Sequence, residues 1–224
     1  MFTSLATAAV ALATAAAPAP ADFGTTITNP YLPMRVGSRW VYREGAARDV
    51  VTVTKRTKLT AGGVTARVVH DVTREHGRPV EITDDYYAQD RKGNVWYLGE
   101  ATTTYEHGTP KSTEGSFEDG VDGGKGGIIM PAHPKVGLRY KQEDYKGHAE
   151  DRAEIVSRNE HVRVPKGRFD NTLMTVETSP VEPDVLEAKF YARGVGPVLA
   201  VDISGGTDRE ELVSFRAGAR TTRG

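Results

Sequence analysis

Six histidines are the first residues to consider for metal binding or proton transfer near neutral pH. None of them is spaced as His-x-His, His-x-x-x-His or His-Glu-x-x-His, the patterns that place two ligands on one face of an element. We therefore expect no local metal site and no metal cofactor. The histidines are expected at the surface or in turns: His70, His76, His107, His133, His148 and His161.

Nucleophilic catalysis also lacks a sequence signal. The chain has no cysteine, hence no thiolate, and no Gly-x-Ser-x-Gly elbow around a serine. Adjacent carboxylates occur at Asp84-Asp85 and Glu210-Glu211, but neighbours on a strand point to opposite faces and make poor acid/base partners. We expect a protein without enzymatic activity. A hydrolase remains a third choice, which would require three polar groups converging in a pocket.

The glycine- and aspartate-rich stretch around 119–127 invites comparison with ion and phosphate sites. It lacks the alternating oxygen ligands and closing Glu of an EF-hand, and it lacks the spacing and the Ser or Thr of a phosphate loop. A solvated loop is the favoured interpretation. A loose calcium site involving Glu118, Asp119 and Asp122 is the alternative.

Aromatic residues offer a different chemistry, the binding of apolar molecules. Their pattern leaves two interpretations open: the rings fill the core, or some of them line a concavity that holds an apolar or amphipathic ligand. In the second case we expect Trp40, Trp96 and Tyr140 to line it. The aromatic residues in the repeated segments are Trp40, Tyr42, Tyr86, Tyr87, Trp96, Tyr97, Tyr105, Tyr140, Phe190 and Tyr191.

The elements that must position these rings are predicted to be antiparallel strands. Runs of β-branched and aromatic residues alternate with turns every ~10 residues, and no apolar period of 3.6 persists beyond two turns. The segment 84–100 is typical of a hairpin, with its turn at 90–94. Helix content should be small, and a single helical turn is expected at 182–186.

The strand pattern occurs twice. Met34-Arg35-Val36-Gly37-Ser38-Arg39-Trp40 aligns with Pro134-Lys135-Val136-Gly137-Leu138-Arg139-Tyr140, and Tyr87-Ala88 aligns with Tyr191-Ala192. Matches in the same order at nearly constant spacing indicate a tandem duplication. We predict a mainly β fold: an antiparallel duplicated meander that forms a curved sheet, half-barrel or barrel. The pseudo-repeats span about 30–105 and 130–215, joined by a Gly/Asp-rich connector at 106–127 with one short strand around Phe117.

Composition is that of a soluble globular protein. The chain has 224 residues, of which 38% are hydrophobic and 26% charged, with a formal net charge of −1. Near-neutral charge gives no reason to expect nucleic-acid binding, and the chain is long enough to form a core without disulfides. Oligomeric state is not predicted.

Residues 1–21 are expected to be a signal peptide, because an apolar stretch ends in the small residues Ala19-x-Ala21, which favours cleavage before Asp22. No other apolar run approaches the ~20 residues of a membrane span. We therefore expect a secreted protein without a lipid anchor on cysteine. It should comprise one β domain at 22–215 and a disordered tail at 216–224.

Three segments resemble a loose group of uncharacterised exported bacterial proteins, whose openings read Leu-x-x-Gly-x-x-Trp-x-Tyr. They are Leu32 to Tyr42, Asn94 to Glu100, and Tyr191-Ala192-Arg193-Gly194-Val195-Gly196. Distant relatives look like the curved half-barrels of lipoprotein-carrier and lipid-binding envelope proteins. The resemblance implies a hollow sheet but supplies no catalytic residues.

These observations predict a secreted, non-catalytic protein that binds an apolar or amphipathic small molecule or lipid in a β-sheet concavity. The alternative is an extracellular structural or protein-interaction protein with a filled core and an exposed apolar patch.

Overall fold

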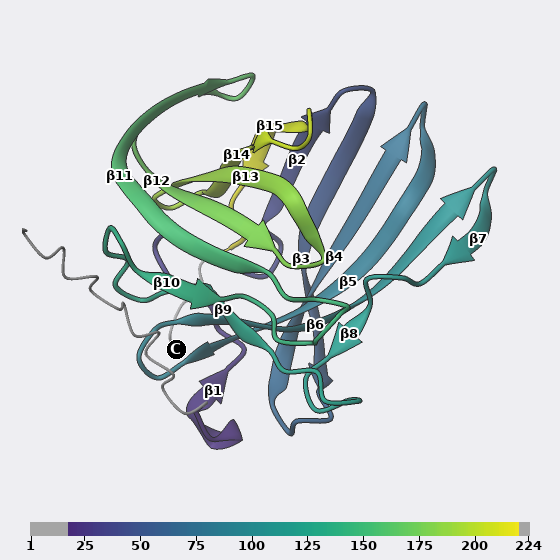
Figure 1. The fold of residues 1–224 in the computed structure, drawn as a ribbon, viewed down its shortest axis with the longest axis vertical. Coiled ribbons are helices and arrows are strands. Elements are labelled where there is room, and N and C mark those ends of the chain that lie inside the picture. Colours follow the sequence, from purple (N-terminus) through teal and green to yellow (C-terminus); the bar gives the residue numbers. More distant parts are fainter. Residues whose placement is uncertain (1–17, 220–224) are drawn as a thin grey trace, which may run out of the picture.

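A computed structural model describes residues 18–219 (Figure 1). Apart from the short 3₁₀ helix η1 (Pro20–Asp22), its regular elements are strands: β1 (Phe23–Gly24), β2 (Arg39–Glu44), β3 (Ala47–Leu59), β4 (Thr65–Glu75), β5 (Arg78–Asp90), β6 (Val95–Glu106), β7 (Thr109–Ser112), β8 (Phe117–Glu118), β9 (Gly127–Met130), β10 (Arg139–Lys141), β11 (Arg152–Val164), β12 (Gly167–Ser179), β13 (Glu182–Ala192), β14 (Gly196–Ser204) and β15 (Arg209–Arg216). The predicted mainly β fold is confirmed.

All the strands belong to one antiparallel sheet, in the order β10-β11-β12-β13-β14-β15-β2-β3-β4-β5-β6-β7. Most neighbours in this order are also neighbours in the chain, because tight turns join them. The exception is β15, the last strand, which pairs with β14 on one side and with β2 on the other. The strands β1, β8 and β9 pair with β5 or β6 outside this path.

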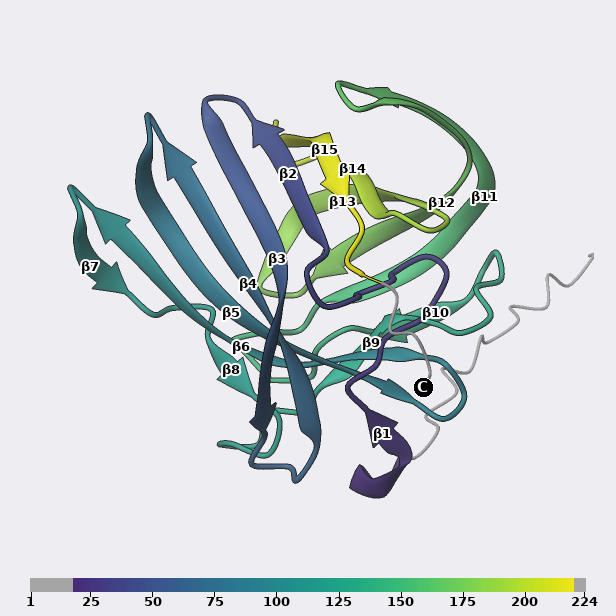
Figure 2. The same ribbon diagram turned by 180° about the vertical axis from the view of Figure 1, so that it is seen from behind.

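The sheet is strongly curved and does not close. In Figures 1 and 2, β11 and β12 arch over one side while β3 to β7 fan out on the other. Register shifts interrupt β3 between Val53 and Thr57 and interrupt β11 at three places. Such bulges bend a strand and increase its twist. They allow long strands to wrap around a common interior, as the curved-sheet prediction requires.

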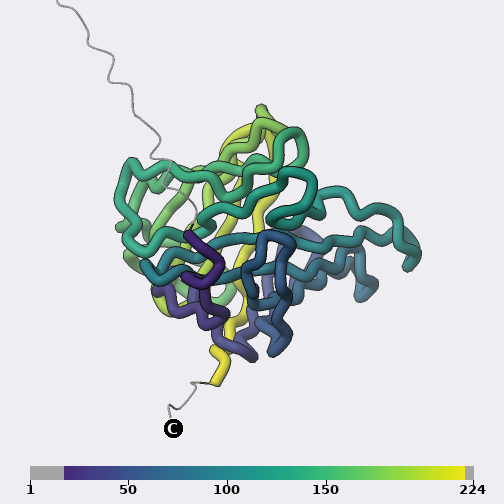
Figure 3. Tube along the Cα trace, turned by 90° about the horizontal axis from the view of Figure 1, so that it is seen from below, coloured from purple at the N-terminus to yellow at the C-terminus, as the bar shows by residue number. Residues whose placement is uncertain are grey.

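The interior between the two sides is the main hydrophobic core. Its fully buried members include Val69, Ile155, Leu173 and Leu212. The chain before β2 crosses one end of the sheet and adds apolar side chains to this core, among them Ile27. Figure 3, seen from below, shows the purple N-terminal segment lying against the sheet at this end. A separate small cluster forms where Phe23 and Trp96 pack on Val68 and Tyr86.

The two halves of the chain contribute equivalent strands, β2–β6 and β10–β14. The turns that precede β2 and β10 also match in detail. Gly37 has φ of 85° and its N–H donates to the Val53 carbonyl over 2.8 Å, while Gly137 has φ of 84° and donates to Ile155 over 2.8 Å. A positive φ strongly favours glycine, which explains why this residue is shared. These matches support the proposal of a tandem duplication.

The expected helical turn at 182–186 is wrong. These residues begin β13, and Leu186 pairs with Ser204 of β14, because the chain already reverses between Ser179 and Glu182. The connector at 106–127 contains β7 and β8, with Phe117 of β8 buried. No helix in residues 18–219 has the length and apolar character needed to cross a membrane.

Most of the predicted signal peptide (1–17) and residues 220–224 of the predicted tail lie outside the described residues. Within the described part, the N–H of Gly218 donates to the Ser38 hydroxyl over 2.9 Å. The chain after β15 therefore remains in contact with the turn that precedes β2.

Candidate functional site

A cavity of about 290 Å³ lies between β2–β5 on one side and β13–β15 on the other. The chain before β2 and strand β9 complete its wall. Its lining residues are Leu32, Met34, Trp40, Tyr42, Asp49, Val51, Val69, Asp71, Asp85, Tyr87, Ile129, Lys189, Tyr191, Pro197, Ala200 and Glu210. Both halves of the chain therefore contribute to the cavity, and its lining combines aromatic, aliphatic and carboxyl groups.

We define the apolar floor as the aromatic and aliphatic residues of this lining other than Tyr42, Pro197 and Ala200. Its members are Leu32, Met34, Trp40, Val51, Val69, Tyr87, Ile129 and Tyr191. The Trp40 ring is held in place, since its Nε1–H donates to the Val195 carbonyl over 2.8 Å and it packs on Phe215 at 5.1 Å between ring centroids. The Tyr42 hydroxyl likewise donates to the Pro197 carbonyl over 3.1 Å. With their polar atoms engaged in the wall, these rings present apolar surface to the cavity.

Four carboxyl groups form the carboxyl belt of the cavity: Asp49 on β3, Asp71 on β4, Asp85 on β5 and Glu210 on β15. They share the concave face because side chains alternate along a strand and the register matches Val51 with Asp71 and Val69 with Asp85.

The carboxyl belt occupies one end of the cavity. We define the tip end as the end of the sheet that carries the β2–β3 and β4–β5 turns. On β3, Asp49 lies two residues nearer the tip end than Val51, and on β4 Asp71 lies two residues nearer than Val69. The same spacing separates Asp85 from Tyr87, Lys189 from Tyr191, and Glu210 from Leu212. The cavity is therefore amphipathic along its length.

Burial makes these carboxyl groups hard to ionise. It raises the pKa of Asp85 to about 7 and that of Glu210 to about 8. Burial, together with the neighbouring Asp49, raises the pKa of Asp71 far above its usual range. Nearby, burial also raises the pKa of Glu100 to about 8 and that of Glu143 to about 7.

Hydrogen bonding distinguishes the members of the belt. The Oδ1 atom of Asp85 accepts a hydrogen bond from the Tyr97 hydroxyl over 2.7 Å. The Oδ1 atom of Asp71 is fully buried and has no partner among the described residues. Because buried polar atoms in folded proteins are nearly always paired, Asp71 is the polar group of the cavity that calls for an explanation.

Among residues 18–219, Lys189 is the one cation that lines the cavity, and it is already paired. Its Nζ lies 2.9 Å from Glu177 and 2.9 Å from Glu187, two carboxylates outside the belt. Burial acts to lower the pKa of Lys189, but these two carboxylates outweigh it and hold the pKa above its usual value. Lys189 also acts to lower the pKa of Glu210, but burial outweighs it.

The three residues predicted to line a concavity lie in different places. Trp40 lines the cavity. Trp96 does not: it packs edge-on against Phe23 at 5.6 Å, and its Nε1–H donates to Asp90 over 3.1 Å. Tyr140 is 8% exposed in the main core, and its hydroxyl has no partner among the described residues.

Sequence reasoning did not select the carboxyl belt. Asp84-Asp85 and Glu210-Glu211 are predicted to point to opposite faces, and the structure places them so. Asp85 and Glu210 line the cavity, whereas Asp84 and Glu211 pair with arginines outside it. The available signal for the belt was an acidic residue two positions from an apolar one on the same strand, such as Asp49 and Val51, because such residues share a face.

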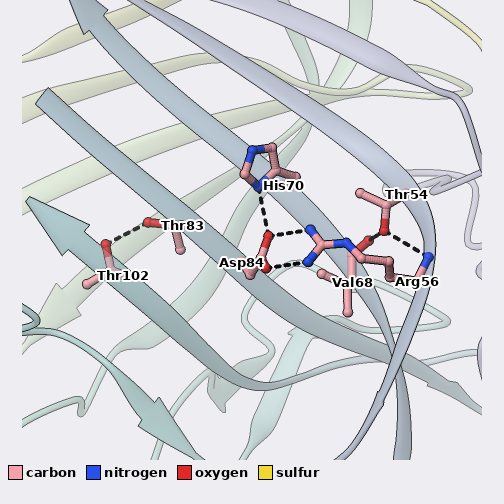
Figure 4. Close-up of polar contacts among 7 residues, drawn as sticks. All are labelled: Thr54, Arg56, Val68, His70, Thr83, Asp84 and Thr102. Carbon is pink, nitrogen blue, oxygen red and sulfur yellow. Dashed lines mark hydrogen bonds and ion pairs between the residues drawn. The ribbon is translucent and has the colours of Figure 1, made fainter. Parts of the chain in front are cut away.

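The cluster around Asp84 is the main polar cluster outside the cavity (Figure 4). Arg56 binds both carboxylate oxygens of Asp84 at 2.7 and 2.6 Å, and Nδ1 of His70 lies 2.7 Å from Oδ1. Burial acts to raise the pKa of Asp84, but these two partners outweigh it and lower the pKa. Within residues 18–219 no hydroxyl group hydrogen-bonds to His70, so the cluster links β3, β4 and β5 without forming a nucleophile–base pair.

Figure 4 also shows two hydrogen bonds between adjacent strands, made by threonine hydroxyl groups. Thr54 donates its hydroxyl hydrogen to the Val68 carbonyl over 2.7 Å, so it is engaged with the backbone. The hydroxyl groups of Thr83 on β5 and Thr102 on β6 lie 2.6 Å apart and are hydrogen-bonded to each other. Both contacts tie neighbouring strands together.

Metal binding finds little support in the described geometry. No three His, Asp or Glu side chains in residues 18–219 are arranged to hold an ion. In the suggested calcium loop, Glu118 accepts a hydrogen bond from the Ala61 N–H over 2.8 Å, and Asp119 accepts one from the Gly126 N–H over 3.1 Å. These two carboxylates therefore accept hydrogen bonds from backbone N–H groups and hold the neighbouring turns in place.

No model of a known protein family and no curated protein matches the chain. Among solved structures it is similar to a putative lipoprotein from Parabacteroides distasonis ATCC 8503. The two are 11% identical with a TM-score of 0.44, over 83% of this chain and 98% of that chain.

Proposed function

We propose that the protein is an exported, non-catalytic binding protein that holds a small amphipathic ligand in the cavity beside Trp40. The observation that carries this proposal is the cavity's polarity, with the apolar floor at one end and the carboxyl belt at the tip end. The N-terminal apolar stretch supports export.

The size and construction of the cavity fit this role. Its volume of about 290 Å³ is at the lower end of small-molecule sites, which span about 300–1,000 Å³. Most of its wall comes from paired strands, and the segment before β2 adds Leu32 and Met34. The shape is therefore largely preformed, and little ordering is needed when a ligand binds. A few polar groups among apolar walls are typical of sites that orient a ligand.

The alternative of a structural or interaction protein predicts a filled core and a contiguous apolar patch. The large exposed apolar side chains of residues 18–219 come instead from separate segments of the chain, with only Val136 and Leu138 in the same turn: Leu59, Val121, Val136, Leu138, Val181 and Ile203. Scattered residues of this kind are normal on a protein surface. The strands at the two ends of the main path, β10 and β7, have three and four residues, and short edges are poor templates for pairing.

The hydrolase alternative depended on polar groups converging in a pocket, and the carboxyl belt does converge on the cavity. Paired carboxyl groups of unequal pKa can act as acid and base. Assays of ligand binding should therefore also look for chemical change of the ligand. Recovery of the ligand unchanged is the result expected for a binding protein.

Native mass spectrometry of protein purified from its own source tests the proposal, followed by denaturation of the same sample. A mass excess that disappears on denaturation is expected, and its value names the ligand class. A second readout uses Trp96→Phe, which leaves Trp40 as the sole tryptophan. An apo mass, together with Trp40 emission that no amphipathic probe changes, would reject ligand binding here.

A further inference from the structure

We propose that the ligand is an organic cation: a molecule with one protonated amine or guanidinium group on a short apolar body. The cationic group would lie in the carboxyl belt beside Asp71, and the body would lie on the apolar floor. This inference rests on the proposed function and specifies the chemistry that the same cavity recognises.

Charge is the first argument. Carboxyl groups enter the cavity from β3, β4, β5 and β15, as Asp49, Asp71, Asp85 and Glu210. Two further acids lie near Asp85, namely Glu100 on β6 and Glu143 after β10, and the negative charge of Asp85 raises the pKa of both. The one cation in the lining, Lys189, is paired with Glu177 and Glu187. A positively charged group inside the belt would favour the ionised form of these acids, and it would therefore bind in exchange for protons.

The unpaired oxygen of Asp71 is the second argument. Asp71 lines the cavity, and its Oδ1 atom is buried without a hydrogen-bond partner among residues 18–219. A buried acceptor without a donor is costly, and the cost is greatest when the group carries charge. An ammonium or guanidinium group brings several N–H donors at once. It can therefore pair with Asp71 and with a second carboxyl group together.

The aromatic rings are the third argument. Trp40, Tyr42, Tyr87 and Tyr191 all contribute to the lining. Aromatic faces attract organic cations, most strongly where water is excluded. The same rings also accept the apolar part of the ligand. Carboxyl groups and aromatic faces in one cavity therefore favour a cation over a purely apolar molecule.

Other ligand classes fit less well. An anionic head, such as a carboxylate or phosphate, would be repelled by the belt. A neutral apolar ligand would bring no hydrogen-bond donor to the carboxyl belt. A metal ion needs several oxygens at short, convergent distances, and no group of three such residues is arranged for an ion in the described part of the chain.

The test compares three probes of matched shape: 2-phenylethylammonium, 2-phenylethanol and 3-phenylpropanoate. Each is titrated into the full-length Trp96→Phe protein at pH 8, with Trp40 emission and calorimetry as readouts. The ammonium is expected to bind at least tenfold tighter than the alcohol, and the carboxylate is expected to give no saturable signal. Equal affinity of the ammonium and the alcohol would overturn the inference while leaving the proposed function intact.

Two substitutions in the belt locate the effect. Asp71→Asn and Glu210→Gln each keep the shape of a protonated acid, so both variants are expected to fold. Each should weaken ammonium binding at least tenfold and change alcohol binding less than twofold. Glu182→Gln, at an exposed position on β13, is the matched control and should change neither affinity.

The outcomes separate the two proposals. If the ammonium binds tightly but neither belt variant weakens it, the assigned site is wrong. If none of the three probes changes Trp40 emission and the purified protein has an apo mass, the proposed function itself fails. Thermal melts of both belt variants verify folding, and Glu210→Gln still decides the question if Asp71→Asn does not fold.

Discussion

At the scale of single residues, the alternation of side chains along a strand separates two kinds of acidic group. Asp84 and Asp85 are neighbours, yet the pKa of Asp84 is lowered by Arg56 and His70 whereas that of Asp85 is raised to about 7 by burial. One carboxylate ties strands together on one face, and the other faces the cavity. The same chemical group therefore has two roles that depend on orientation.

Two buried tyrosines allow the value of a hydrogen bond to be measured. Tyr97 and Tyr140 are each 8% exposed, but the Tyr97 hydroxyl donates to Asp85 and the Tyr140 hydroxyl has no partner among the described residues. Tyr97→Phe should destabilise the protein by about 1–3 kcal/mol, because a buried acceptor loses its donor. Tyr140→Phe should be neutral or stabilising by up to about 1 kcal/mol. Urea unfolding followed by circular dichroism measures both, and equal losses would contradict this account.

Glycine at position 99 is required by a close approach between strands. It has φ of +133°, and a Cβ there would meet the Phe117 carbonyl oxygen and lie 2.8 Å from Glu118 Cα, where β8 pairs with β6. Gly99→Ala should cost more than about 2 kcal/mol, since backbone must move. Gly77→Ala, at a turn with open space around it, should cost only about 1–2 kcal/mol from its positive φ. Chemical denaturation ranks the two variants, and a reversed ranking would refute the argument.

At the scale of elements, β15 connects the two halves of the sheet. It pairs with β14 of the second half and with β2 of the first, although the chain positions of β15 and β2 are far apart. Leu212 of β15 is fully buried in the main core. The strand therefore stabilises the interface that contains the cavity.

Truncation of Leu212 tests the importance of this strand. Leu212→Ala should lower the free energy of unfolding by about 2–5 kcal/mol, because apolar contacts are lost and a void is left in the core. The matched control is Leu59→Ala at the end of β3, where the side chain is 67% exposed and the expected change is within about 0.5 kcal/mol. Thermal and urea unfolding measure both. A loss below about 1 kcal/mol at Leu212 would show that the connection contributes little.

The sequence predicted the antiparallel strands because strand formation depends on local rules. Gly37 and Gly137 mark turns that require positive φ. Tyr87 and Tyr191 each lie two residues from another side chain that lines the cavity, Asp85 and Lys189 respectively. The pairing of β15 with β2 could not be predicted in this way, since it joins distant segments. The carboxyl belt was missed for the same reason: whether Asp84 or Asp85 faces inward depends on which face of the sheet becomes concave. Trp40 and Trp96, similar in sequence context, lie on different sides for that reason.

At the scale of the whole molecule, a net charge of −1 conceals an uneven distribution. Carboxyl groups are concentrated inside the curved sheet, where burial raises the pKa of Asp85, Glu210, Glu100 and Glu143 to values between about 7 and about 8. In the unfolded chain such groups ionise near pH 4. The folded protein therefore binds more protons than the unfolded chain across the interval between pH 4 and pH 8, and its stability falls as pH rises through that interval.

The ligand-free protein should consequently be most heat-resistant at mildly acidic pH. Between pH 5 and pH 8.5 we expect Tm to fall by at least about 5 °C, which corresponds to about 2 kcal/mol for a chain of this size. Glu210→Gln should flatten this dependence because it removes one of the groups whose pKa is raised, whereas the exposed control Glu182→Gln should not. Differential scanning calorimetry at several pH values provides the measurement. A Tm that is constant or rises over this interval would mean that the belt carboxyl groups ionise as freely in the folded protein as in the unfolded chain, and that they are open to water.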